Sequence, residues 1–383
     1  MTSIGTATPV VPGRLEQFST RVAFFIAGFS ISAWAPMVPY AKARLGLDDA
    51  SLGLLLLCLG IGSILSMPLA GAMTVRWGCR RIIIWVSCLT CLCLPLLATL
   101  SSLPMMVATL FVFGASMGVL DCVINFQAII VERASGKTMM SGFHGLFSCG
   151  GIAGAAGVSA LLSVGVWPWL TMVIVALLIG FALYRAAPNL IAYGSESGGP
   201  VFAVPQGVVL FIGLLCFTVF LTEGAMLDWS AVFLSAQRGV EASYAGFGYA
   251  VFALAMTIGR VWGDPVVRRL GAHKIILFGG ACAAAGMAIA TLIPYWQVAL
   301  CGYALIGIGC SNIVPVFYSA VGRQKTMPEN VAVPAITTLG YMGILMGPAG
   351  IGFVAHLSSL NVAFMIITFM LLGVAASGRY LKV

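Results

Sequence analysis

Long apolar runs separated by short polar breaks make up most of the chain. A membrane-spanning helix needs about 20 mostly apolar residues, and twelve runs come close to that length or exceed it. They cover residues 21–41, 51–74, 81–100, 104–131, 139–162 and 166–185 in the first half, and 206–234, 243–263, 274–293, 296–321, 331–355 and 360–381 in the second. The pattern predicts an all-α membrane protein with twelve transmembrane helices.

A polar stretch divides these runs into two groups of six. The segment "AAPNLIAYGSESGGPVFAVPQ" is rich in Gly, Ser and Pro, a composition typical of linkers. We therefore expect a cytoplasmic linker at residues 186–205 between two six-helix bundles at residues 21–185 and 206–383. Residues 1–20 form a predicted cytoplasmic tail, whose polar sequence lacks the apolar region of a cleaved signal peptide.

The composition indicates that lipid is the solvent, since 61% of the residues are hydrophobic and only 8% are charged, against roughly 25% charged in soluble domains. Basic residues give an orientation, because Lys and Arg concentrate in cytoplasmic loops. With the N-terminus inside, 16 of the 19 basic residues fall on the cytoplasmic side, Arg260 among them, and Lys42, Arg44 and Arg238 fall outside. Both termini are thus predicted to be cytoplasmic, in an inner membrane, and the net charge of +8 needs no nucleic-acid partner.

The two halves share a motif at one fixed offset. Arg76, Gly78 and Arg81 follow the second run, and Arg269, Gly271 and Lys274 follow the eighth, 193 residues later. Gly53 and Gly246 keep the same offset, as do Gly114 and Gly307. Two parallel repeats of six helices predict a pathway between two bundles that rock around a site at mid-membrane depth.

The architecture and the first copy of this motif resemble the major facilitator superfamily. "GAMTVRWGCRR" is similar to the superfamily signature G-x-x-x-D-R-x-G-R-[RK], with Val75 in the place of the Asp. The resemblance implies two pseudo-symmetric six-helix bundles. It also implies a cytoplasmic gate, to which we assign Gly71, Arg76, Gly78, Arg81, Arg269 and Gly271.

A narrower resemblance extends over most of the chain. The segments "GVLDCVINFQ", "MSGFHGLFSCGG", "TEGAMLDWSAVFL", "LAMTIGRVWGD" and "TLGYMGILMGPAG" resemble the bacterial YbjJ-like transporters, and the Asp-x-x-x-Asn of the first segment is similar to the fucose/galactose/glucose:proton symporter group. YbjJ-like transporters often carry an Arg in the first span, where this chain has Met37. No Lys or Arg falls in the core of any predicted span, so the buried acids are expected to lack a basic partner.

Polar residues at mid-membrane depth are the candidates for function. Asp121 and Asn125 lie one helical turn apart, and counting back from Glu132 places Asp121 about 16 Å deep at ~1.5 Å per residue. His144, on the next run, reaches a similar depth, so an Asp–Asn–His cluster is expected. Because ionisable residues inside a membrane mark ion and substrate paths, we assign proton coupling to Asp121.

Substrate binding is assigned to polar and aromatic residues around this depth: Asn125, His144, Asn312 and Trp34. Asn312 precedes Arg323 by 11 residues, the same spacing as Asp121 before Glu132. A purely structural hydrogen bond between helices is an equally open interpretation for His144 and for both amides.

The run 206–234 carries two further acids, Glu223 and Asp228. Five residues turn a helix by about 500°, so the two carboxylates point about 140° apart and do not form a pair. Glu223 is assigned to the pathway as a second proton-coupling residue. Asp228 and Trp229 are assigned to the outer mouth, because Trp is typical of the membrane interface.

These features predict a proton-coupled secondary transporter of a small polar organic solute, working as a monomer by alternating access. An efflux antiporter is the main alternative, and a membrane receptor without transport is a weaker one. The chain has no HExxH, P-loop or complete GxGxxG motif, so an enzyme is not expected. Neither a cofactor nor a metal is expected, because Cys88, Cys91 and Cys93 lie in an apolar run without His or acid partners.

Overall fold

The computed structural model describes residues 12–194 and 203–380. In the first half the helices are α1 (Arg14–Trp34), η1 (Ala35–Met37), α2 (Val38–Leu45), α3 (Asp49–Thr99), α4 (Leu103–Ser135), α5 (Met140–Ser163), α6 (Pro168–Ala186) and η2 (Ala187–Asn189). In the second half they are α7 (Gly207–Arg238), α8 (Ala242–Ala245), α9 (Phe247–Val261), α10 (Gly263–Leu270), α11 (Ala272–Leu292), α12 (Trp296–Cys310), α13 (Ile313–Val321), α14 (Glu329–Leu357), α15 (Leu360–Ser377) and η3 (Gly378–Tyr380). Within these ranges all regular secondary structure is helical, as predicted.

The predicted number of spans agrees with the helices observed. Ten helices, and one further pair bent by 63° at the junction of α9 and α10, are long and apolar enough to cross a membrane. One of the ten, Ser51–Thr99, has 49 residues and would measure about 73 Å, more than twice the hydrocarbon thickness of about 30 Å. It is interrupted at Gly78, whose backbone is not helical. Counting that helix twice gives 10 + 1 + 1 = 12 spans in the described part of the chain.

Two of the predicted spans had wrong boundaries. The first span is helical from Arg14 and continues through η1 and α2 to Leu45. The eighth was predicted to end at residue 263, but the helix only bends there and α10 carries it on to Leu270. Residues 1–11 of the predicted tail, 195–202 of the predicted linker and 381–383 of the second bundle lie outside the described residues.

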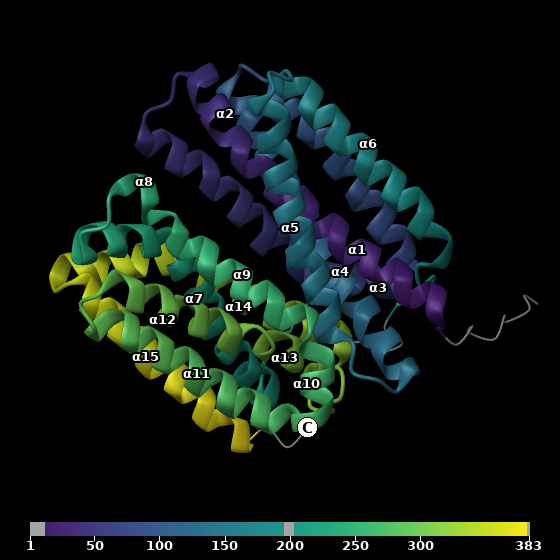
Figure 1. Cartoon of the computed structure of the whole chain (residues 1–383). Helices are drawn as coiled ribbons and strands as arrows, with labels where there is room; N and C mark the ends of the chain where they lie inside the picture. The colour runs from purple at the N-terminus through teal and green to yellow at the C-terminus, as the bar shows by residue number, and fades with distance from the viewer. Residues whose placement is uncertain (1–11, 195–202, 381–383) are drawn as a thin grey trace, which may run out of the picture.

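Figure 1 shows the helices of the first half, purple to teal, beside those of the second half, green to yellow. We call the end of the molecule that holds Arg14, the α4–α5 turn, η2, Gly271 and η3 the linker end, and the other end the opposite end. The halves contact each other mainly through α3 with α14 and through α5 with α9. These two helix pairs therefore form the main contacts between the halves.

The repeat seen in the sequence recurs in the backbone geometry. Gly78 has φ 76° and ψ 162°, and Gly271 has φ 79° and ψ 159°, so the two motif glycines turn the chain in the same way. Gly46 and Gly239, also 193 residues apart, both end a helix in the left-handed conformation. Gly114 packs against the carbonyl of Leu59, and its counterpart Gly307 packs against that of Phe252.

Arginines close the same helix end in each half. The Arg44 guanidinium donates to the carbonyl oxygens of Leu97, Ala98 and Leu100 at 2.7–2.9 Å. The Arg238 guanidinium donates to those of Ala290 and Thr291 at 2.8 and 2.7 Å. The last carbonyls of a helix have no partner within it, and a cation there also offsets the negative end of the helix dipole. Two of the three basic residues predicted for the outside therefore cap helix ends.

We expect Gly271→Ala to lower the melting temperature of the purified protein. A positive φ with an extended ψ is essentially restricted to glycine, so alanine costs about 1–3 kcal/mol. Gly78→Ala should lower it further, because a Cβ at residue 78 would also overlap the Ala192 carbonyl, whereas nothing lies within 4 Å at residue 271. Gly157→Ala, in α5 with free space around it, is the matched control. Equal melting temperatures for all three variants would contradict the expectation.

Candidate functional site

A cavity of about 480 Å³ lies between the two halves. Its walls come from α1, α5, α7, α9 and α14, with η1 contributing Ala35. On α1 the lining begins at Ile31, near the far end of a helix that starts at the linker end, and on α9 it begins at Tyr249, close to the opposite end. The cavity therefore runs from the middle of the bundles toward the opposite end.

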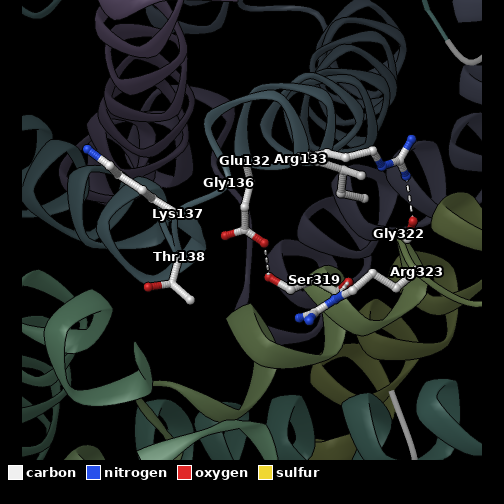
Figure 2. Close-up of a pocket in the computed structure, with 9 residues that line it drawn as sticks. Glu132, Arg133, Gly136, Lys137, Thr138, Ser319, Gly322 and Arg323 are labelled. Carbon is white, nitrogen blue, oxygen red and sulfur yellow. Dashed lines mark hydrogen bonds between the residues drawn. The ribbon is translucent and has the colours of Figure 1, made fainter. Parts of the chain in front are cut away.

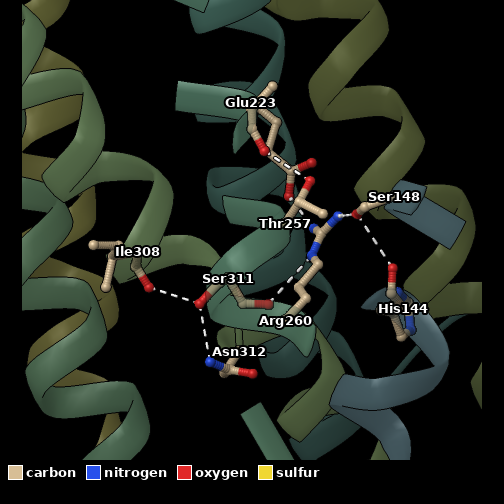
Figure 3. A network of polar contacts seen from close by, with 9 residues as sticks. His144, Ser148, Glu223, Thr257, Arg260, Ile308, Ser311 and Asn312 are labelled. Atoms are coloured by element: carbon tan, nitrogen blue, oxygen red, sulfur yellow. Dashed lines mark hydrogen bonds and ion pairs between the residues drawn. The ribbon is translucent and has the colours of Figure 1, made fainter. Parts of the chain in front are cut away.

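A buried ion pair forms the floor of this cavity. The Arg260 guanidinium of α9 lies 3.1 Å from Oε1 of Glu223 on α7. Only 8% of the Arg260 side chain and 17% of the Glu223 side chain are exposed. Arg260 also donates to the Ser148 hydroxyl of α5 at 3.0 Å and to the Ser311 carbonyl at 3.3 Å (Figure 3). One guanidinium thus links α7, α9 and the loop before α13 to a helix of the other half.

The expectation that no basic residue lies in a span core was wrong. Arg260 was assigned to the cytoplasmic side because the eighth span was predicted to end at residue 263. Since the helix only bends at Trp262 and Gly263, Arg260 stays in the interior of the bent pair. A sequence signal was present: Arg260 stands eight residues before Arg268 and nine before Arg269, which carry the charges of the true helix end. Met37, which stands where YbjJ-like transporters often have an Arg, is buried. The buried arginine in the described part of this chain is Arg260, in the second half.

Part of the predicted Asp–Asn–His cluster is formed. His144 Nε2 lies 3.2 Å from Asn125 Oδ1, and both side chains are buried. The His144 ring also packs against Phe24 and Tyr318, with ring centroids at 5.2 and 5.5 Å. The Ser148 hydroxyl donates to the His144 carbonyl at 3.2 Å, so this pair is connected through Ser148 to Arg260.

The Asp121 carboxylate does not join this cluster. The Asn125 amide donates to the Asp121 main-chain carbonyl at 2.9 Å rather than to the carboxylate. Asp121 is half-buried and close enough to Tyr318 and Tyr341 to interact with both electrostatically. Glu223 acts on Tyr341 as well. Tyr341 of α14 is therefore within electrostatic range of an acid from each half.

Asn312 and Trp34 do not line the cavity. The Asn312 amide donates to the Gly259 carbonyl at 3.0 Å and to the Ser311 hydroxyl at 2.9 Å. It thereby connects the break between α12 and α13 to the bend after α9. Trp34 is buried, and its ring N–H has no hydrogen-bond partner in the described part of the chain.

The two residues assigned to an outer mouth lie beyond Glu223 on α7. Asp228 is exposed, and Trp229 is half-buried against Gly352 of α14. Neither lines the cavity, whereas Glu223 does. The predicted divergence of the two acids is therefore seen in the structure.

At the linker end the halves are held together by polar contacts (Figure 2). Glu132 of α4 accepts a hydrogen bond from the Ser319 hydroxyl of α13 at 2.5 Å, and its other oxygen accepts the amides of Met139 and Met140. Arg133 forms an ion pair with Glu329 of α14 at 2.7 Å. We call these interactions of Glu132 and Arg133, together with those of Asp264 described next, the linker-end contacts.

Asp264 contributes to the same closure from α10. Its Oδ1 accepts the Gly142 amide at 3.1 Å, and its carbonyl accepts the Thr138 hydroxyl at 3.1 Å. Asp264 stands 193 residues after Gly71. Gly71 in turn packs tightly against the main-chain carbonyl of Asn330 in the other half. Residues 71 and 264, which are equivalent in the two copies of the repeat, thus each contact the opposite bundle.

The arginines predicted for the gate take no part in these contacts. Arg76 is exposed and stacks on Trp77 at 5.0 Å from the ring centroid, and Arg81 and Arg269 are exposed. Sequence reasoning missed the acids at residues 132, 264 and 329, which were not distinguished from ordinary loop charges. The one available signal was the distance of Asp264 from Gly71, which equals the repeat offset.

Comparisons with known proteins agree with this architecture. The chain is 55% identical to an uncharacterized MFS-type transporter of Yersinia pestis over 371 residues, 97% of each protein. It is 31% identical to the membrane protein MosC of Rhizobium meliloti, over 93% of this chain and 88% of that one.

Among solved structures, the fucose:proton symporter FucP of E. coli superimposes with a TM-score of 0.80 at 15% identity, over 96% of this chain and 98% of FucP. A structure of FucP in the outward conformation gives a TM-score of 0.78 at 17% identity, with the same coverage. The family model of the Major Facilitator Superfamily matches residues 22–332. This protein is therefore a membrane transporter rather than an enzyme, and it belongs to the Major Facilitator Superfamily.

Proposed function

We propose that the protein is a proton-coupled secondary active transporter that moves a small polar organic solute by alternating access. The observation that carries the proposal is the Glu223–Arg260 ion pair at the floor of the cavity. A carboxylate there is costly in a membrane unless it is paired or protonated, and such residues mark transport pathways. Glu223 alternates between these two states, so it can carry a proton together with a solute.

The linker-end contacts support alternating access. They close one end of the space between the halves, and the cavity reaches toward the other end. The excess of Lys and Arg at the linker end favours a cytoplasmic location for it. With that orientation in an inner membrane, both termini are cytoplasmic and the cavity opens outward, the direction named for one of the FucP structures.

Glu223 and Asp121 are both assigned to proton coupling in this proposal, and Glu223 is the residue that holds the proton at the binding site. Glu223 lines the cavity and touches the only buried cation among its lining residues in the described chain, whereas Asp121 lies outside the cavity wall. Asn125 and His144 adjoin the site through Ser148. Asn312 and Trp34 are placed beside the pathway, because they do not line it in this conformation.

The test begins with a thermal-shift screen of purified protein against sugars, amino acids, nucleosides and organic acids, since a solute that binds the folded state raises its melting point. A solute that binds is then supplied to proteoliposomes with an inward or an outward proton gradient. We expect accumulation to follow the proton gradient inward and to disappear with a protonophore. Accumulation against the direction of the proton gradient would instead indicate an antiporter. Transport unaffected by either gradient would refute proton coupling.

We expect Glu223→Gln and Asp121→Asn to abolish accumulation but to retain downhill exchange. Both amides preserve the shape of the acid but cannot carry a proton. The two variants should differ in binding: the dependence of solute affinity on pH is lost in Glu223→Gln and kept in Asp121→Asn, because only Glu223 adjoins the cavity. If one of the variants still accumulates solute in response to a pH step, the residue changed in that variant is not required for proton coupling.

A further inference from the structure

We propose that the transported solute is an organic monoanion whose carboxylate takes the place of Glu223 on Arg260 while Glu223 takes up the proton. This inference rests on the proposed function and names its substrate class. Three features support a monoanion: the two charged residues that line the cavity, the hydrogen bonds of Arg260, and the net charge of the closed site.

The cavity offers one cation and one anion. Of the lining residues that the structure describes, Arg260 and Glu223 alone carry a charge, and they are paired with each other. The other polar lining groups are hydroxyls: Ser32, Ser148, Tyr249 and Thr257. Most of the remaining wall is apolar. A solute that fits this lining presents one charged group to the floor and an apolar or hydroxylated body to the walls.

Arg260 is built to hold a carboxylate. A guanidinium has five N–H donors in a planar fork that matches two carboxylate oxygens. Three of these donors have described partners: the Glu223 carboxylate, the Ser148 hydroxyl and the Ser311 carbonyl. The contacts to Ser148 and Ser311 hold the guanidinium in place from two sides. A solute carboxylate can therefore replace Glu223 on the cavity side without reorienting the arginine.

Few other ionisable groups surround Glu223. Those within its electrostatic range on every packed element are Arg260 and Tyr249 of α9, Tyr341 of α14, Cys310 of α12 and Cys216 of α7 itself. From α5, His144 lies near Arg260 and is hydrogen-bonded to Asn125. Phenols and thiols are neutral near pH 7 in their usual range. Among the residues that the structure describes, Arg260 is thus the one cation that faces Glu223.

Charge neutrality then couples the proton to the solute. The empty site, with Glu223 ionised and Arg260 charged, has no net charge. Binding an anion alone would leave a net charge of −1, and protonating Glu223 alone would leave +1. Binding the anion and the proton together restores neutrality. Because an uncompensated charge in a water-poor membrane interior costs several kcal/mol, the two neutral states are the ones that can close and cross.

The net charge of the site also disfavours neutral and cationic solutes. A neutral solute carried with a proton leaves Arg260 uncompensated, and a cation bound to Glu223 also leaves a net charge of +1, since arginine keeps its proton. Co-transport of one monoanion with one proton is the combination that keeps the site neutral throughout. It is also electroneutral, so it needs no membrane potential.

Binding to the purified full-length protein tests this, because short carboxylic acids cross lipid unaided and obscure a flux assay. The probes are straight-chain carboxylates from butanoate to octanoate, each compared with its primary amide and primary amine. We expect at least one carboxylate to bind more than tenfold more tightly than its amide. Its Kd should rise roughly tenfold per pH unit where Glu223 is ionised in the free protein, because one proton is taken up with it.

Two variants assign the effect to the ion pair. Glu223→Gln should bind the same carboxylate with a Kd that no longer varies with pH, since Arg260 is then free of its partner. Arg260→Gln should bind carboxylate and amide equally weakly. Wild-type protein that binds no carboxylate better than its amide, or binds it with a pH-independent Kd, would overturn the proposal.

Failure of the anion proposal can be told apart from failure of proton coupling. If a neutral solute such as L-fucose binds and drives proton movement that Glu223→Gln abolishes, proton coupling is retained and the monoanion proposal is rejected. If no solute that binds moves protons, the proposed function itself falls.

Discussion

Arg260→Ala is expected to lower the melting temperature of the purified protein more than any other single change at the site. Removing one partner of a buried ion pair costs about 3–5 kcal/mol, because the other charge remains buried without compensation. Glu223 would keep its carboxylate among α7, α9 and α14 with no cation, and Ser148 and the Ser311 carbonyl would lose a donor. Solute binding should be lost as well.

The double variant Glu223→Leu with Arg260→Met separates charge from packing. Replacing a buried pair by apolar residues of similar volume is often neutral or stabilising, so the double variant should recover most of the melting temperature that Arg260→Ala loses. It should still not bind or transport the solute. Equal melting temperatures for the single and the double variant would mean that the unpaired Glu223 carboxylate is not the cause of the loss.

Gly71→Leu is expected to abolish transport by preventing closure of the linker end. A Cβ at residue 71 would already lie far inside contact distance of the Asn330 carbonyl, and backbone atoms cannot give way as a flexible side chain can. A leucine there should therefore force α3 and α14 apart and break the Arg133–Glu329 ion pair beside them. The conformation with a closed linker end would be lost.

Spin labels measure this directly. Lys137 and Lys325 are exposed on opposite halves at the linker end, and labels there, in a background freed of the 11 cysteines, report the distance between the halves. We expect Gly71→Leu to lengthen that distance. Gly180→Leu is the control, because residue 180 of α6 has no neighbour within 4 Å of its Cβ position. Unchanged distance and normal transport in Gly71→Leu would exclude Gly71 from the gate.

Much of the architecture was predictable because lipid imposes a length on every span. Apolar runs gave the twelve helices, and the offset of 193 residues gave the repeat that Gly78 and Gly271 show in their backbone angles. The Asn125–His144 contact was predictable too, since depth along two consecutive helices places both residues at one level. These are properties of single helices and of their immediate neighbours.

The central ion pair was not predictable in the same way. Arg260 lies beside a bend that resembles a helix end, since Gly, Asp and Pro follow it in "GRVWGDPVV", and only the two arginines further along indicate that the helix continues. Glu132 and Asp264 are similar cases, because a charge in a short loop is common whether or not it touches the other bundle. Partners that lie across the space between two halves depend on how the bundles pack, and periodicity within one helix carries no information on that.

In the proposed mechanism Glu223 carries a proton whenever solute crosses. The most direct measurement is the pH of a lightly buffered medium around proteoliposomes, recorded without any imposed gradient when a solute is added that the thermal-shift screen has found and that does not cross protein-free liposomes. Solute entry through the wild-type protein should make the medium more alkaline, and Glu223→Gln, which retains only solute exchange, should cause no pH change. Solute entry without alkalinisation in the wild type, or the same alkalinisation in Glu223→Gln, would contradict the mechanism.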